Sequence, residues 1–289
     1  MELARAARSD CSGVCGVRSL GLRRVVGGFV SPAEVTSTGS RGTRVIGSIV
    51  LAGIVFHVLL SFVWSDPDAD QGDLVRIMYV HVPSAWLAYM AFTVTAFGGV
   101  MYLWKRSLWW DLVAGASAEI GVVFCALALV TGSIWGRPTW GTYWEWTDVR
   151  IVTTLVLLLL YIGYLAVRRI PADPHQRSRR AAVVGIIAAL NIPIVRFSVD
   201  WWADRTLHQK ATIKLGGTEL DGLMLFALFF GLILFTLIYA WMMIHRFRIA
   251  WLDEQIDRHG LDAAIAERLA ESTSDVTRAV GLTKTGADL

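Results

Sequence analysis

The sequence predicts an all-α integral membrane protein with six transmembrane helices. Of its 289 residues, 55% are hydrophobic and only 18% are charged, and the mean hydropathy is +0.51. These values lie well outside the range of soluble globular domains. Apolar runs of about twenty residues, the length that crosses a bilayer as a helix, recur along the chain. The net charge of +3 is too small to indicate a nucleic-acid partner.

Each predicted span is an apolar run that ends at charged, polar or turn-forming residues. The six runs are 45–64, 80–104, 112–135, 151–167, 181–199 and 223–244. In the fifth run, Asn191 and Pro193 predict a kink, with the freed backbone groups satisfied by neighbouring helices. Residues 250–271 predict a further helix that is soluble or lies on a surface.

The predicted domains are a flexible cytoplasmic tail (1–44), a six-helix membrane domain (45–245) and a partly helical cytoplasmic tail (246–289). The first tail lacks a continuous apolar stretch, so we do not expect a secretory signal peptide. Six spans place both termini on one side, and the positive-inside rule makes that side cytoplasmic. The loop residues behind this assignment are Lys105, Arg106, Arg168, Arg169, Arg177, Arg179, Arg180, Arg246 and Arg248.

Residues 135–150, here called the Trp segment, lie on the opposite, periplasmic side in this topology. Their rings belong to Trp135, Trp140, Tyr143, Trp144 and Trp146. Gly136, Pro138 and Gly141 predict that no regular helix continues here, which makes the segment an aromatic loop. One interpretation is an interfacial aromatic belt. Because the rings are concentrated in one place, a surface for a large, flat, apolar ligand is the favoured interpretation.

The same topology sorts the six histidines. His175, His245 and His259 fall on the cytoplasmic side, and His57 lies within the first span. His81 and His208 fall on the side of the Trp segment. Imidazole nitrogens can ligate haem iron, and aromatic faces can cover a porphyrin. The alternative is that these two histidines cap helices or meet lipid headgroups.

Other polar groups leave several interpretations open. The arginines that could meet haem propionates are Arg76, Arg137, Arg150, Arg196 and Arg205. Glu119 inside the third span is either functional or part of a helix contact, and His57 either reaches a ligand or bonds a neighbouring helix.

The remaining motifs mostly exclude functions. Cys11, Cys15 and Cys125 cannot build a disulfide framework or a four-ligand zinc site, although the Cys11–Cys15 pair could bind metal or haem. The sequence contains no Walker, zinc-protease, Ser–His–Asp or GxGxxG motif, so we do not expect the chain to hydrolyse ATP.

Four stretches carry a resemblance to a known family. They are RIMYVHVPSAW (76–86), LVTGSIWGRPTWGTYWEW (129–146), NIPIVRFSVDWW (191–202) and TLHQKATI (206–213). The Trp motif alone marks the wider haem-handling superfamily, which includes CcsA-type synthase subunits. With the other blocks and the six-span plan, residues 45–245 resemble CcmC, the haem-handling membrane proteins of cytochrome c maturation.

This resemblance implies a haem-transfer protein rather than a classical enzyme. Such a protein would sit in the bacterial cytoplasmic (inner) membrane, bind haem b at the periplasmic face and present it to the haem chaperone CcmE. CcmA, CcmB and CcmD would be further partners, and membrane lipid would surround the spans. The axial ligands would be His81 and His208. The cofactor-binding set would add Trp135, Trp140, Trp144, Trp146 and Arg150.

The chain departs from the family pattern in three places. One extra residue, at Thr147 or Asp148, separates Trp146 from Arg150. The stretch before His208 is longer, and Arg196 stands where relatives often have histidine.

Two alternative functions are a CcsA-type cytochrome c synthase subunit and a cofactor-free membrane permease or scaffold.

Overall fold

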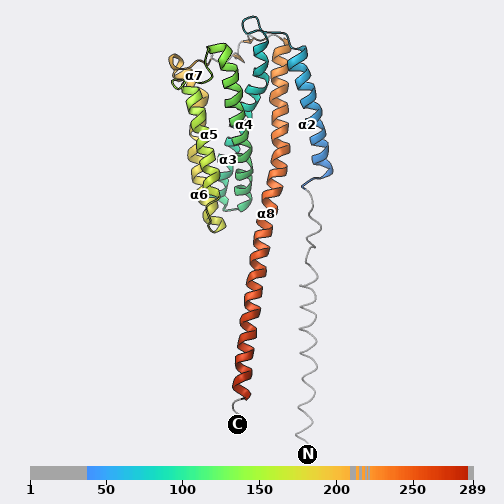
Figure 1. Ribbon diagram of the computed structural model, residues 1–289, viewed down its shortest axis with the longest axis vertical. Coiled ribbons are helices and arrows are strands. Elements are labelled where there is room, and N and C mark those ends of the chain that lie inside the picture. Colours follow the sequence, from blue (N-terminus) through green and yellow to red (C-terminus); the bar gives the residue numbers. More distant parts are fainter. Residues whose placement is uncertain (1–37, 209–212, 215–216, 219, 221, 286–289) are drawn as a thin grey trace, which may run out of the picture. The chain divides into compact units, whose positions relative to one another are not determined.

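A computed structural model describes residues 38–208, 213–214, 217–218, 220 and 222–285. Within these residues, six helical segments are long and apolar enough to cross a membrane, which confirms the predicted six-span, all-helical fold (Figure 1). Cys11 and Cys15 lie outside the described residues, so their role stays a prediction. The predicted domain boundaries and cytoplasmic termini also stay predictions.

The spans are built from helices with short connections. Their bounds are α2 Arg41–Leu59, continued by the π-helical turn η2 Leu60–Trp64; α3 Met78–Lys105, preceded by the 3₁₀ turn η3 Asp73–Ile77; α4 Leu108–Trp140; α5 Val149–Arg168; α6 Pro174–Ala189; α7 Asn191–Trp201; and α8 Gly222–Thr285. The 3₁₀ turn η4 Ala203–Arg205 and a short antiparallel pair, β1 Ile213–Lys214 with β2 Gly217–Thr218, lie between α7 and α8.

Helices α3 and α4 form the centre of the bundle. Their buried faces meet α5, α6 and α8 in one apolar core, in which the rings of Phe92 and Tyr161 stack with centroids 3.8 Å apart. Gly98 lets α3 approach α4 closely, since a Cβ there would lie 3.0 Å from the Cβ of Ala114. Helix α2 packs against α8 and leaves much of its apolar surface exposed, as expected for a lipid-facing helix.

The prediction that the Trp segment breaks the helix at Gly136 is wrong. Helix α4 continues through Pro138 to Trp140 and ends at Gly141, whose φ of 80° is left-handed. Pro138 removes only one helical hydrogen bond close to the helix end. The last turn is held by Thr139 Oγ1, which donates to Trp135 O at 2.8 Å, and by Gly141 N–H, which donates to Arg137 O at 3.0 Å. The loop is therefore confined to the residues from Gly141 to Asp148.

The predicted kink in the fifth span is confirmed. Helix α6 ends at Ala189, Leu190 forms a turn, and α7 begins at Asn191. The side-chain amide of Asn191 donates to the backbone O of Thr153 in α5 at 2.8 Å. The side chain at the break thus bonds a neighbouring helix, whereas the pairing of the freed backbone groups stays a prediction.

Helix α8 is longer than the predicted sixth span. The helix predicted over 250–271 is its uninterrupted continuation, drawn from orange to red in Figure 1. The sequence here contains no proline and is rich in Ala, Leu, Glu and Arg, which favour helix.

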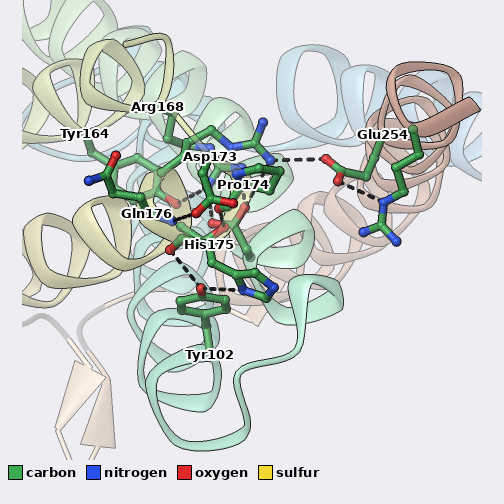
Figure 2. A network of polar contacts seen from close by, with 12 residues as sticks. Tyr102, Tyr164, Arg168, Asp173, Pro174, His175, Gln176 and Glu254 are labelled. Carbon is green, nitrogen blue, oxygen red and sulfur yellow. Dashed lines mark hydrogen bonds and ion pairs between the residues drawn. The ribbon is translucent and has the colours of Figure 1, made fainter. Parts of the chain in front are cut away.

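A network of ion pairs joins the helices at the end of the bundle opposite the Trp segment (Figure 2). Arg168 of α5 bonds both carboxylate oxygens of Asp111, which is only 2% exposed. Nη2 of Arg177 in α6 lies 3.9 Å from Oδ2 of Asp111 and 3.2 Å from Oε2 of Glu254 in α8. Because the network joins α4, α5, α6 and α8, it fixes the continuation of α8 to the bundle.

Candidate functional site

A cavity of about 440 Å³ lies at the Trp end, the end of the bundle where residues 141–148 connect α4 to α5. Helices α3, α4, α5 and α7 supply its wall, and His208 completes it. Its lining includes His81, Trp140, Trp144, Arg150, Arg196 and His208. The volume and the largely apolar wall with a few polar groups are typical of a small-molecule site.

His81 projects from the first turns of α3, and its ring orientation is fixed by α4. Its Nδ1 lies 3.0 Å from the backbone O of Ala128 and 3.2 Å from Thr131 Oγ1. A carbonyl oxygen can only accept, so Nδ1 carries the proton and donates. Nε2 is then the nitrogen with a free lone pair, which is the state that a metal-ligating imidazole requires.

Gly132 makes room for this ring. A Cβ at position 132 would lie 2.8 Å from Cε1 of His81 and 3.3 Å from Nδ1. A larger residue would therefore push the imidazole away from Ala128. The edge of Trp135 packs against the same ring, with centroids 5.8 Å apart.

Asp148 joins three segments at the Trp end and is 1% exposed. Its Oδ1 accepts from Ile151 N–H at 2.8 Å, which caps the N-terminus of α5. Its Oδ2 accepts from Leu207 N–H at 2.6 Å and from Thr206 Oγ1 at 3.1 Å. The same oxygen lies 3.6 Å from His208 Nδ1. Asp148 thus attaches the segment that carries His208 to the start of α5.

The charge of Asp148 is stabilised despite its burial. Burial alone would raise the pKa of this carboxyl, but His208 and the backbone N–H groups of Ile151 and Leu207 outweigh that effect and lower the pKa to about 2. The group is therefore a carboxylate at neutral pH, facing one side of the His208 imidazole.

His208 lies against the Trp segment. Its ring centroid is 4.9 Å from that of Trp140. Its Nδ1 is buried and, within the described chain, has no hydrogen-bond partner closer than the 3.6 Å contact with Asp148. An imidazole held by an indole and a carboxylate, with a ring that lines the cavity, has the surroundings expected of an axial haem ligand.

Two arginines supply positive charge to the cavity wall. Arg150 donates from Nη2 to the backbone O of Arg196 at 3.1 Å and from Nε to Ser198 Oγ at 3.4 Å. In the part of the chain that the structure describes, neither Arg150 nor Arg196 forms an ion pair with a carboxylate. The two guanidinium groups could therefore bind the propionates of a porphyrin.

The structure gathers most of the predicted site residues around one cavity. His81, His208, Trp140, Trp144 and Arg150 line it. The other two predicted indoles do not. Trp135 lies beside His81 and donates from Nε1 to Gln71 Oε1 at 2.8 Å. Trp146 is 71% exposed and meets Trp144 edge-on at 5.5 Å.

Other candidates lie away from the cavity. Of the arginines considered for propionates, Arg76 bonds Phe62 O and Asp73, and Arg137 bonds Gly141 O. Glu119 pairs with Arg246 of α8, so this carboxylate makes a helix contact.

Sequence reasoning missed Tyr89 and Asp200, which also line the cavity, and the joining role of Asp148. Tyr89 follows His81 by eight residues and so shares its helix face, a signal that could have identified it. Asp148 lies three residues before the apolar run that begins at Ile151, close to the usual position of an N-cap. Its bonds to Thr206 and Leu207 join residues far apart in the sequence and left no local signal.

Comparison with known proteins identifies the family. The family model CcmC, "Heme exporter protein C", matches residues 25–261. Heme exporter protein C of Bradyrhizobium diazoefficiens is 46% identical over 175 residues, 60% of this chain and 65% of that protein. The Escherichia coli K12 protein of the same name is 40% identical over 170 residues, 58% of this chain and 66% of the relative.

A third relative is covered more fully. Heme exporter protein C of Haemophilus influenzae is 35% identical over 212 residues, 73% of this chain and 84% of that protein. The matches to the Bradyrhizobium and Escherichia proteins span just under two thirds of those relatives. Since the family model covers most of this sequence, the chain belongs to the CcmC family, Heme exporter protein C.

Proposed function

We propose that this protein binds haem b in the cavity at the Trp end and presents it to the haem chaperone CcmE during cytochrome c maturation. The observation that carries this proposal is the state of His81. Its Nδ1 donates to Ala128 O at 3.0 Å, which leaves Nε2 free on a residue that lines the cavity. His208, which lines the same cavity, would be the second axial ligand.

The remaining wall suits a porphyrin. Trp140 and Trp144 offer aromatic faces, and Arg150 and Arg196 offer cations to the propionates. Iron ligated by two imidazoles would have no open coordination site for oxygen. The protein's own contribution is to bind, orient and release its cargo, with no covalent chemistry required of its side chains.

The proposed orientation places the Trp end at the periplasmic face of the bacterial inner membrane. The connection before α3 at this end carries Asp66, Asp68, Asp70 and Asp73, whereas the opposite connections carry clustered arginines. The positive-inside rule supports this assignment.

Exposed rings beside the cavity suggest where CcmE would dock. Tyr143 is 61% exposed, Trp146 71% and Trp201 57%. Aromatic side chains are common anchors in protein interfaces. CcmA, CcmB and CcmD are proposed as the other partners, by analogy with the family.

The test is the visible absorption spectrum of the full-length protein, purified in detergent after expression with ample haem. The wild type should show a Soret band with low-spin bis-imidazole features, and His81→Ala and His208→Ala should each lose or alter it. His259→Ala is the matched control, because His259 is exposed on the continuation of α8 and bonds the backbone O of Gln255 in its own helix. A colourless wild type would overturn haem binding and favour a cofactor-free permease or scaffold.

Delivery is tested separately by coexpression with CcmE and apocytochrome, followed by haem staining of the denatured proteins. Covalent haem on CcmE should depend on both His81 and His208. If either variant loads CcmE normally, the axial assignment is wrong. Haem that reaches apocytochrome in the absence of CcmE would favour the synthase alternative.

A further inference from the structure

The first turns of α3 lack one helical donor immediately beside His81. Pro83 has no N–H, so position 83 cannot donate the usual helical hydrogen bond to the backbone O of Tyr79, four residues earlier. His57 of α2 bonds this carbonyl, with its Nε2 3.0 Å from Tyr79 O. Because the carbonyl can only accept, Nε2 of His57 is protonated and donates. A side chain from another span thus completes the helix.

The His57 ring is held by residues of α2 and α8. Its side chain belongs to a residue only 5% exposed, and Ser61 Oγ lies 3.4 Å from its Nδ1, where the hydroxyl donates to the free lone pair. Phe230 and Phe235 of α8 pack around it, with ring centroids 5.9 and 6.5 Å away. The donor that reaches Tyr79 is therefore fixed in position by both α2 and α8.

Gly231 of α8 shows how closely the three helices meet here. A Cβ at this position would lie 2.8 Å from Cε1 of His57 and 3.1 Å from Cγ of Pro83. The absence of a side chain at 231 lets the histidine and the proline ring occupy the same layer. Helix α8 thereby supports the contact between His57 and the Tyr79 carbonyl.

This layer lies in the turn of α3 that carries His81. Tyr79 precedes His81 by two residues and Pro83 follows it by two. The direction of the Tyr79 carbonyl constrains the backbone from which the His81 side chain projects. The ring itself must reach Ala128 and Thr131 of α4, at 3.0 and 3.2 Å. A change in the first turn of α3 would disturb both contacts.

We propose that His57 is a positioning residue for the haem site. Acting through the carbonyl of Tyr79, it sets the orientation of His81, although His57 does not line the cavity. It also makes α2 and α8 part of the support of the ligand. This inference rests on the proposed function, because it concerns the role of His81 as an axial ligand.

The test uses the proline as an internal suppressor. His57→Ala removes the donor that bonds Tyr79 O, whereas Pro83→Ala restores an N–H that can bond the same carbonyl. We expect His57→Ala to release haem to apomyoglobin about tenfold faster than wild type, the effect of losing one buried hydrogen bond. We expect altered low-spin g values in its electron paramagnetic resonance spectrum. His57→Gln, whose amide can donate, should stay near wild type, and His57→Ala/Pro83→Ala should recover most of the loss.

A haem-free measurement checks the same coupling. In thermal unfolding of the apo proteins in detergent, Pro83→Ala should reduce the destabilisation caused by His57→Ala. The inference is wrong if the double variant releases haem as fast as His57→Ala, or if His57→Ala has the wild-type spectrum and release rate. A colourless wild type would instead defeat the proposed function. The two failures are therefore distinguishable.

Discussion

The backbone N–H of Leu207 donates to Oδ2 of Asp148 at 2.6 Å. This bond joins the residue before His208 to the residue that caps α5. Because Oδ1 of the same carboxylate accepts from Ile151 N–H at 2.8 Å, one buried group sets both the start of a span and the position of the second proposed ligand.

Asp148→Asn should destabilise the protein in a pH-dependent manner. The folded-state pKa of Asp148 is about 2, below its usual value of 3.8, so its stabilising effect is present above pH 4 and is lost as the pH falls towards 2. The shift corresponds to a loss on the order of 2 kcal/mol at pH 7. Detergent-phase unfolding at several pH values would measure it.

Asp173→Asn is the matched control for this prediction. Asp173 also caps a helix, accepting from Gln176 N–H at 2.9 Å at the start of α6. Because an Asn side-chain oxygen also caps a helix, Asp173→Asn should cost well below about 1 kcal/mol and leave haem binding unchanged. Asp148→Asn should in addition weaken haem retention, because it loosens the segment that carries His208. Equal haem retention in both variants would show that Asp148 does not position His208.

Gly132→Ala should weaken haem retention by displacing His81. The new methyl group would lie 2.8 Å from Cε1 of the ring, which must move away from Ala128. Gly163→Ala is the control, because a Cβ there meets nothing within 4 Å and should be neutral or stabilising by about 0.5 kcal/mol. Haem titration would compare the haem affinities of the two variants. Wild-type affinity in Gly132→Ala would contradict the proposed orientation of His81.

Substitution of Trp140 and of Trp146 should affect haem binding differently, although both belong to the Trp segment. Trp140 lines the cavity and contacts His208, so Trp140→Ala should lower haem affinity about tenfold or more, the loss expected from one buried aromatic contact. Trp146 lies outside the cavity lining and is 71% exposed. Trp146→Ala should keep haem affinity but reduce delivery to CcmE, measured by haem staining. Equal affinity losses would mean that the exposed ring also binds the porphyrin.

Two ion pairs at the opposite end of the bundle should also differ. Asp111 is 2% exposed and bonded by Arg168, so Asp111→Asn should cost about 3–5 kcal/mol by leaving a buried cation without its partner. Glu119 and Arg246 are both about 40% exposed, so Glu119→Gln should cost less than about 1 kcal/mol. Measuring the free energy of unfolding of both variants tests this prediction. The prediction is wrong if Glu119→Gln is the more destabilising substitution.

The sequence predicted the parts of this molecule that depend on local pattern. The spans follow from apolar runs, and the break before α7 follows from Asn191 and Pro193. His81 and His208 could be paired because the topology alone places them at the same end. The length of an apolar run and the effect of a proline both depend on short stretches of sequence, so they can be predicted without a structure.

Features that depend on contacts between distant segments could not be predicted. The continuation of α4 past Gly136 depends on packing and on side-chain bonds in the last turn. The same limit applies to Trp135, which bonds Gln71 instead of lining the cavity. A helix–helix contact is one of the two roles that the sequence predicts for His57, but its partner, the Tyr79 carbonyl, is visible only where Pro83 and α2 meet in the structure.

The positions of His81 and His208 in the chain have a consequence for biosynthesis. His81 belongs to the second span, whereas Asp148 cannot anchor the segment at Thr206 and Leu207 until the fifth span has been made. Under the proposed function, most of the membrane domain must be synthesised before both imidazoles can bind one haem. Haem binding would then require nearly complete insertion, and a chain truncated before residue 208 would retain only one of the two proposed ligands.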